Sequence, residues 1–125
     1  MLRQLIAVAA LATALVAVPA TSAKDGDVLV RGTCTGATTS KLKLSEEDGR
    51  IEVEFEVDQN RNGVRWTVTL RRPTVLLVRT TRVTRGPSGS FELRRVVGNR
   101  AGSDRIIARA TRSSGEVCRA AATFG

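Results

Sequence analysis

Residues 51–57 read Ile-Glu-Val-Glu-Phe-Glu-Val, so every odd-numbered position is apolar and every even-numbered position is Glu. Residues 64–71 read Val-Arg-Trp-Thr-Val-Thr-Leu-Arg and alternate in the same way. Because successive side chains of a strand point to opposite faces, this alternation predicts two strands, each with one buried and one solvated face. No segment after Lys24 carries apolar residues at helical spacing. The chain is therefore predicted to be all-β.

The residues between these two strands, 58–63, read Asp-Gln-Asn-Arg-Asn-Gly and are all common in turns. They predict a hairpin. If Val57 pairs with Val64, apolar residues meet on one face, and charged or polar residues meet on the other. The pairs in this register are Phe55 with Trp66, Val53 with Val68, Glu56 with Arg65, and Glu54 with Thr67.

The rest of the chain shows the same pattern of short apolar or β-branched segments separated by turns. The six further strands are predicted at 28–34, around Leu42 and Leu44, and at 74–84, 91–97, 105–110 and 117–124. Seven or eight strands at this spacing predict a single antiparallel β-sandwich or barrel. No linker or internal repeat is visible, so residues 24–125 are predicted to form one domain.

Part of this domain resembles a known family. Phe91-x-Leu93 is followed by Ala101-Gly102-Ser103-Asp104-Arg105-Ile106-Ile107-Ala108. This order resembles the closing strands of bacterial immunoglobulin-like domains, which often carry an AG-x-D-x-[IV]-x-A segment before the last hairpin. The chain as a whole is similar to small secreted actinobacterial proteins of unknown role, and its 17 Arg against 3 Lys suit a high-GC genome. The resemblance implies an immunoglobulin-like sandwich and no particular activity.

Residues 1–23 have the layout of a secretory signal peptide. Arg3 precedes an apolar run of 14 residues, 5–18, after which come Pro19 and several small residues. Thr21 and Ala23 suit cleavage before Lys24, and a second site precedes Thr21. A membrane anchor is the alternative, but a span needs about 20 apolar residues. The sequence predicts a helical signal peptide and an extracellular protein.

Export determines how the two cysteines are interpreted. Cys34 and Cys118 stand near the two ends of the domain, and in an oxidising compartment they are predicted to form one disulfide. A redox pair or a metal site is the alternative. Neither is favoured, because CxxC spacing is absent and two thiols make an incomplete metal shell.

The residue inventory disfavours an enzyme. The chain has no His, so it lacks a Ser-His-Asp site, and it has no P-loop, no Ser-x-x-Lys and no G-x-S-x-G motif. We expect no cofactor and no metal. The seven carboxylates in residues 46–58 could form a cation site, but the alternation predicts that most of them lie on a solvated strand face: Glu46, Glu47, Asp48, Glu52, Glu54, Glu56 and Asp58.

Positive charge is the one functional indication. The net charge is +8, and residues 59–125 hold 14 Arg but only three carboxylates. The positive electrostatic potential of such a surface attracts polyanions. The candidate polyanion-binding residues lie around the turn at 86–89: Arg79, Arg82, Arg94 and Arg95. If that turn closes a hairpin, Arg82 and Arg94 share a face. The alternative is an Arg-rich surface that reflects codon bias alone.

These observations predict a secreted, non-enzymatic binding or accessory module that contacts anionic cell-wall polymers. Specific nucleic-acid binding is disfavoured because the aromatic residues that would stack on bases are predicted to face the core. The alternative is a secreted inhibitor or effector that presents an Arg-rich loop to a protein target. Inhibitors of that kind usually brace the loop with a nearby disulfide, whereas the bridge predicted here joins the chain ends.

Overall fold

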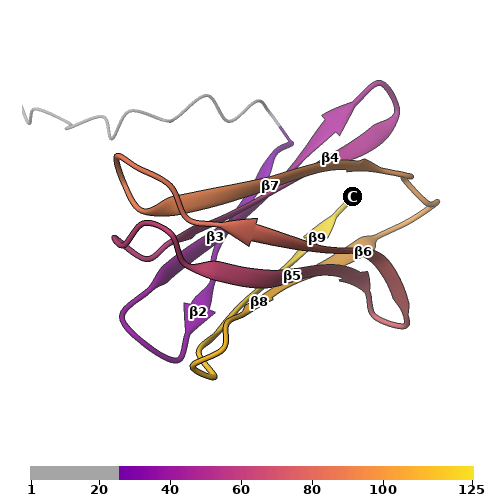
Figure 1. Ribbon diagram of the computed structural model, residues 1–125. Coiled ribbons are helices and arrows are strands. Elements are labelled where there is room, and N and C mark those ends of the chain that lie inside the picture. The colour runs from indigo at the N-terminus through magenta and orange to yellow at the C-terminus, as the bar shows by residue number, and fades with distance from the viewer. Residues whose placement is uncertain (1–25) are drawn as a thin grey trace, which may run out of the picture.

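The computed structural model describes residues 26–125; the predicted signal peptide lies outside the described residues. Two antiparallel sheets pack face to face as a β-sandwich, and Figure 1 shows them as two layers, with β4 and β7 in one and β5 and β8 in the other. The strands are β1 (Val28–Arg31), β2 (Thr33–Cys34), β3 (Thr39–Glu47), β4 (Arg50–Asp58), β5 (Arg65–Arg72), β6 (Val75–Val83), β7 (Ser90–Val97), β8 (Asp104–Thr111) and β9 (Val117–Phe124). The predicted all-β sandwich is confirmed.

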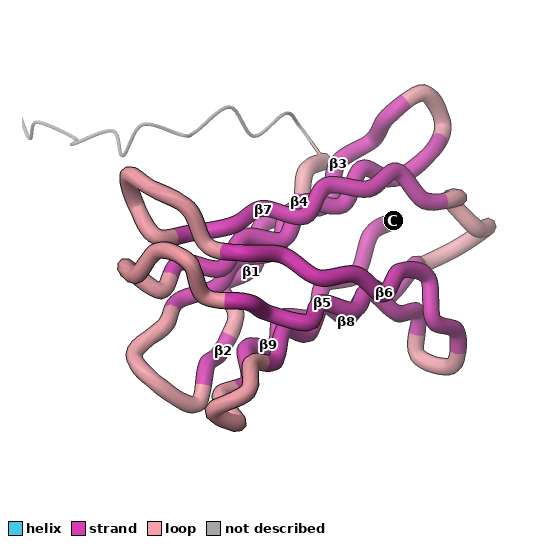
Figure 2. Tube along the Cα trace, in the orientation of Figure 1, coloured by secondary structure: helices cyan, strands magenta, loops and turns pink. Residues whose placement is uncertain are grey.

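The four-stranded sheet has the order β1-β3-β4-β7, and the five-stranded sheet has the order β2-β9-β8-β5-β6. Strands with short loops between them account for nearly all the described chain (Figure 2). In residues 26–125 no helix is long and apolar enough to cross a membrane.

The core lies between the sheets and is built from the inward positions of both. Trp66 and Phe55 are its largest fully buried side chains, and Trp66 lies 6.3 Å from Phe91 between ring centroids. Several inward positions of β8 and β9 are Ala, whose small side chains leave room in the core for the large aromatic residues. The alternation predicted the buried face of β4 and β5 correctly.

The predicted hairpin between β4 and β5 is wrong. β4 pairs with β3 and β7, whereas β5 pairs with β6 and β8 in the other sheet. The loop at 59–64 therefore crosses from one layer to the other. Phe55 and Trp66 both reach the core, but from opposite sheets. Alternation identifies which side of a strand is buried, and two strands facing each other across a core satisfy it as well as two neighbours do.

The single predicted strand at 28–34 is divided between the sheets at Gly32. β1 pairs with β3, and β2 pairs with β9. At Gly32 the chain passes so close to its neighbours that a Cβ would lie 2.1 Å from Ser40 Oγ and 2.8 Å from the carbonyl oxygen of Arg119. Only glycine fits this crossing without displacing the backbone of β9.

The disulfide between Cys34 and Cys118 is present and joins β2 to β9, as predicted. The two residues are direct cross-strand partners, and their Cα atoms are 4.0 Å apart. Cys118 is fully buried, so the bridge closes the edge of the core at this end of the five-stranded sheet.

A buried ion pair closes the opposite end of the same sheet. Arg72, the last residue of β5, donates to Asp104, the first residue of β8, and to the carbonyl oxygen of Gly98. Asp104 also accepts a hydrogen bond from the backbone N–H of Arg100 at 3.0 Å. The side chains of Arg72 and Asp104 are 7% and 2% exposed, so both charges depend on these partners.

Candidate functional site

The structure separates the four arginines that the sequence placed together. β6 carries Arg79 and Arg82 in the five-stranded sheet, whereas β7 carries Arg94 and Arg95 in the four-stranded sheet. The turn at 86–89 is closed by a bridge between Arg85 and Ser90, but the strands on either side then diverge into different layers. The expectation that Arg82 and Arg94 share a face is therefore wrong.

Three of these four arginines already have partners within the described chain. Arg94 donates to Glu52 at 2.5 Å, Arg95 donates to the carbonyl oxygen of Arg94, and Arg82 donates to Thr80 and Thr81. The hydrogen bond from Arg94 holds the pKa of Glu52 below its usual value, despite the opposing effect of burial. Arg79 remains as an exposed cation.

On the outer face of the four-stranded sheet, cations lie beside several of the carboxylates, although Glu56 is also the direct cross-strand partner of Glu92. Glu54 lies between Lys43 and Arg94 as cross-strand partners, and Glu56 forms an ion pair with Lys41 at 3.6 Å. Glu52 is only 7% exposed, so the prediction of a solvated acidic face is wrong for this residue. The side chain of Arg94 reaches Glu52 from the neighbouring strand, and the pattern within one strand does not reveal this contact.

The outer face of the five-stranded sheet has a different character. Along β5, β8 and β9 the inward residues are buried, so the intervening positions face outward. Arg79 of β6 is the direct partner of outward-facing Thr69 and shares its face. We call the six exposed arginines on this side the Arg face: Arg65, Arg71, Arg79, Arg105, Arg109 and Arg119.

The strands of the five-stranded sheet place no Asp or Glu on this face, and none of the six arginines forms an ion pair with the residues at 26–125. Arg109 and Arg119 are direct cross-strand partners. Like charges in this position repel each other and destabilise a sheet. A bound anion would relieve that repulsion.

The Arg face contains a hollow of about 190 Å³ near its centre. Its residues come from three adjacent strands: Thr67, Thr69 and Arg71 from β5, Arg79 from β6, and Ile107, Arg109 and Thr111 from β8. Thr69 pairs with Arg109 on one side and with Arg79 on the other. Guanidinium and hydroxyl groups, which donate hydrogen bonds to anions, therefore surround one point on the sheet.

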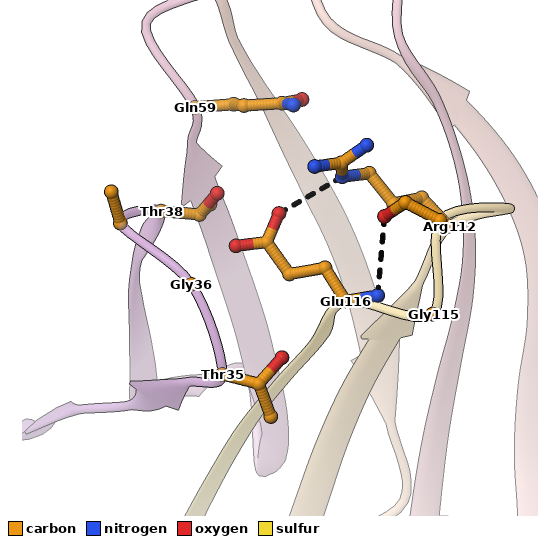
Figure 3. Close-up of a pocket in the computed structure, with 9 residues that line it drawn as sticks. Thr35, Gly36, Thr38, Gln59, Arg112, Gly115 and Glu116 are labelled. Carbon is orange, nitrogen blue, oxygen red and sulfur yellow. Dashed lines mark hydrogen bonds and ion pairs between the residues drawn. The ribbon is translucent and has the colours of Figure 1, made fainter.

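A second hollow, of about 490 Å³, lies at the end of the sandwich beside the disulfide. Figure 3 shows the side chain of Glu116 directed between Arg112 and the loop that carries Gly36 and Thr38. Arg112 donates to Glu116 at 2.9 Å and lies over the Trp66 ring, 5.7 Å from its centroid. A Cβ at Gly36 would lie 2.2 Å from Glu116 Oε2, so glycine allows this close approach.

The charge of Glu116 is compensated inside this second hollow. Burial raises the pKa of Glu116, but hydrogen bonds from Arg112 and Thr38 and the positive charge of Arg112 outweigh it, and the pKa lies below its usual 4.5. The indole N–H of Trp66 donates to Gln59 at 3.1 Å on the same side. The arrangement joins three loops to the core through polar contacts, and it leaves no net charge to attract an ion.

We expect Glu116 to contribute stability that depends on pH. A lowered pKa means that the contribution is complete above pH 4.5 and is lost as the pH falls through the folded-state pKa. Glu116→Gln should lower the free energy of unfolding by about 2 kcal/mol at pH 7 and by less in acid. Urea unfolding at neutral and acidic pH measures both values.

Glu92→Gln is the matched control for this prediction, because it removes one exposed carboxylate and changes the net charge equally. If Glu116→Gln and the wild type lose stability in parallel on acidification, the hydrogen bonds to Glu116 do not stabilise its charged form.

Sequence reasoning missed five of the six residues of the Arg face. Of these six, only Arg79 lies close in sequence to the turn at 86–89 around which the candidates were predicted. The alternation itself contains the signal, because the outward positions of 65–71 and 105–111 hold Arg, Thr and one Ile but no carboxylate. Combining these positions requires the sheet order β9-β8-β5-β6, which the alternation does not provide.

Comparison with known proteins identifies no relative: no protein-family model matches the chain, and no curated protein matches it significantly.

Proposed function

We propose that this protein is a secreted, non-enzymatic binding module that contacts an anionic polymer outside the cell, such as a polymer of the cell wall. The observation that carries the proposal is the Arg face, with six exposed guanidinium groups and no carboxylate among them. The signal-peptide pattern of residues 1–23 supports export, and the disulfide suits an oxidising compartment.

The proposed fold family is the immunoglobulin-like sandwich. Its support is the connectivity: β4 pairs with β7 in one sheet, and β9-β8-β5-β6 follow one another in the other. This matches the B–E pair and the G-F-C-C′ order of immunoglobulin variable-type sheets.

The dimensions of the Arg face suit a polymer better than a single ion. Neighbouring strands lie about 4.8 Å apart, so Arg119 on β9 and Arg79 on β6 are separated by three strand spacings, or about 14 Å. Along β5, Arg65 and Arg71 are six residues apart, or about 20 Å. An extended polyanion can contact several of these charges at once and release several counterions.

We expect binding to weaken steeply with salt. The test uses the full chain, exported through its own N-terminal segment and collected from the medium, where intact mass shows whether it begins near Lys24 or Thr21. Its affinity for heparin and for a purified anionic wall polymer is measured at several salt concentrations. Replacing Arg109 and Arg119 by Gln should lower the affinity and reduce the log–log salt slope by about two.

The matched control replaces Arg31 and Arg50, two exposed arginines of the other sheet, by Gln. It removes the same charge and should keep most of the affinity. Retention that does not change between about 50 and 500 mM salt would reject the proposal. Equal loss in both double variants would show that net charge, rather than the Arg face, is responsible.

The inhibitor alternative has less support from the geometry. The turn at 86–89 packs against the loop between β4 and β5, where the backbone N–H of Gln59 donates to the carbonyl oxygen of Gly89 at 3.0 Å. A Cβ at Gly89 would lie 2.2 Å from the backbone nitrogen of Arg61. The arginines on either side of this turn belong to different sheets, so it does not present them together.

A further inference from the structure

The hollow in the Arg face is too small for a whole ligand and is placed to receive one charged group. Its volume of about 190 Å³ lies below the roughly 300 Å³ at which pockets begin to enclose small molecules. A polymer carrying that group would continue over the remaining arginines of the Arg face. The hollow and the Arg face therefore suit different parts of one ligand.

The donors around the hollow come from different directions. Arg109 and Arg79 stand on opposite sides of Thr69, on strands β8 and β6. Arg71 follows two residues after Thr69 on β5, in the next outward position. Three arginines from three strands therefore line the hollow together with Thr67, Thr69 and Thr111, whose side chains carry hydroxyl groups.

This arrangement distinguishes between kinds of anion. A carboxylate has two oxygens in one plane, and a single guanidinium can contact both of them in a bidentate pair. A phosphoryl or sulfuryl group carries oxygens that point to the corners of a tetrahedron, so it can accept from several guanidinium groups and a hydroxyl together. Three arginines around one hollow match the second geometry.

We infer that the hollow between Arg71, Arg79 and Arg109 binds one tetrahedral oxyanion, so that the polymer contacted by the Arg face bears phosphate or sulfate groups rather than carboxylates alone. This inference rests on the proposed function. The hollow selects the kind of charged group, and the surrounding arginines supply the general attraction.

The test compares polyphosphate, dextran sulfate and polyglutamate of matched charge, at one ionic strength, against the same exported full chain. We expect one or both of the first two to bind at least about tenfold more tightly than polyglutamate, a difference worth about one charge-assisted hydrogen bond. A preference for polyphosphate identifies phosphate as the natural group, and a preference for dextran sulfate identifies sulfate.

Charge-conserving variants test whether the hollow causes the preference. Replacing Arg71 and Arg109 by Lys keeps the charge but removes two planar guanidinium groups. The tenfold preference should therefore fall to about twofold or less. The control replaces Arg65 and Arg105 by Lys; both lie on the Arg face outside the hollow, and the preference should remain. Circular dichroism confirms that both variants are folded.

The outcomes separate the two proposals. If all three polymers bind with salt-dependent and equal affinity, the oxyanion site is rejected and the binding module stands. If both pairs of Lys substitutions abolish the preference, the hollow is not its source, and the inference is likewise rejected. If no polymer binds in a salt-dependent way, the proposed function itself fails.

Discussion

Reducing the disulfide between Cys34 and Cys118 should lower the free energy of unfolding by about 4 kcal/mol. The bridge joins residues with a sequence separation of 84, so it removes a large amount of conformational entropy from the unfolded chain. A domain of this size is stable by only about 5–15 kcal/mol, and the reduced protein should therefore unfold at a much lower urea concentration. Urea titrations with and without a reductant measure the difference.

The variant with both cysteines replaced by Ala separates the cross-link from the reductant. It should match the reduced wild type to within about 1 kcal/mol, because Ala keeps the small apolar volume at buried Cys118. An unfolding midpoint that is unchanged on reduction would show that the bridge adds nothing to stability.

Replacing Asp104 by Ala should be nearly as damaging, with a loss of about 3–5 kcal/mol. The substitution leaves the guanidinium of Arg72 buried without its carboxylate, and it also removes the acceptor for the backbone N–H of Arg100. The loss is read from the urea midpoint at neutral pH. Asp58→Ala, at a half-buried carboxylate near the other end of the sandwich, serves as the control and should cost much less.

A double-mutant cycle identifies the source of that loss. If Arg72 and Asp104 stabilise the fold through their interaction, the variant with both residues replaced by Ala should lose less free energy of unfolding than the two single variants lose together. Additive losses would show that the two side chains act independently.

The secondary structure was largely predictable, and the partners of the strands were not. The alternation of β4 and β5 shows directly which side chains are buried, because burial depends on local period alone. Pairing depends on which strands lie side by side. The cross-strand partners of Glu54 are Lys43 and Arg94, whereas Thr67 was predicted. The outward glutamates agreed with a β4–β5 hairpin, but Glu54 fits its observed neighbours better because two cations replace one hydroxyl.

The division at Gly32 could not be inferred from the pattern either. Residues 28–34 have the composition of one continuous strand, and only the close contact of Gly32 with Ser40 and Arg119 shows why the chain changes sheet there. The Arg face was unpredictable for the same reason, since its arginines come from four strands whose order is a tertiary property.

The position of the disulfide has a mechanical consequence. Of the described residues, only eight precede Cys34 and seven follow Cys118. A force pulling residues 26 and 125 apart can straighten only these 15 residues, which span about 50 Å at full extension, before it reaches a covalent bond. The residues enclosed by the bridge, which include all of β3 to β8, are then shielded from the load. Under tension the oxidised protein therefore behaves as a nearly inextensible link, and the reduced protein as a long and yielding one.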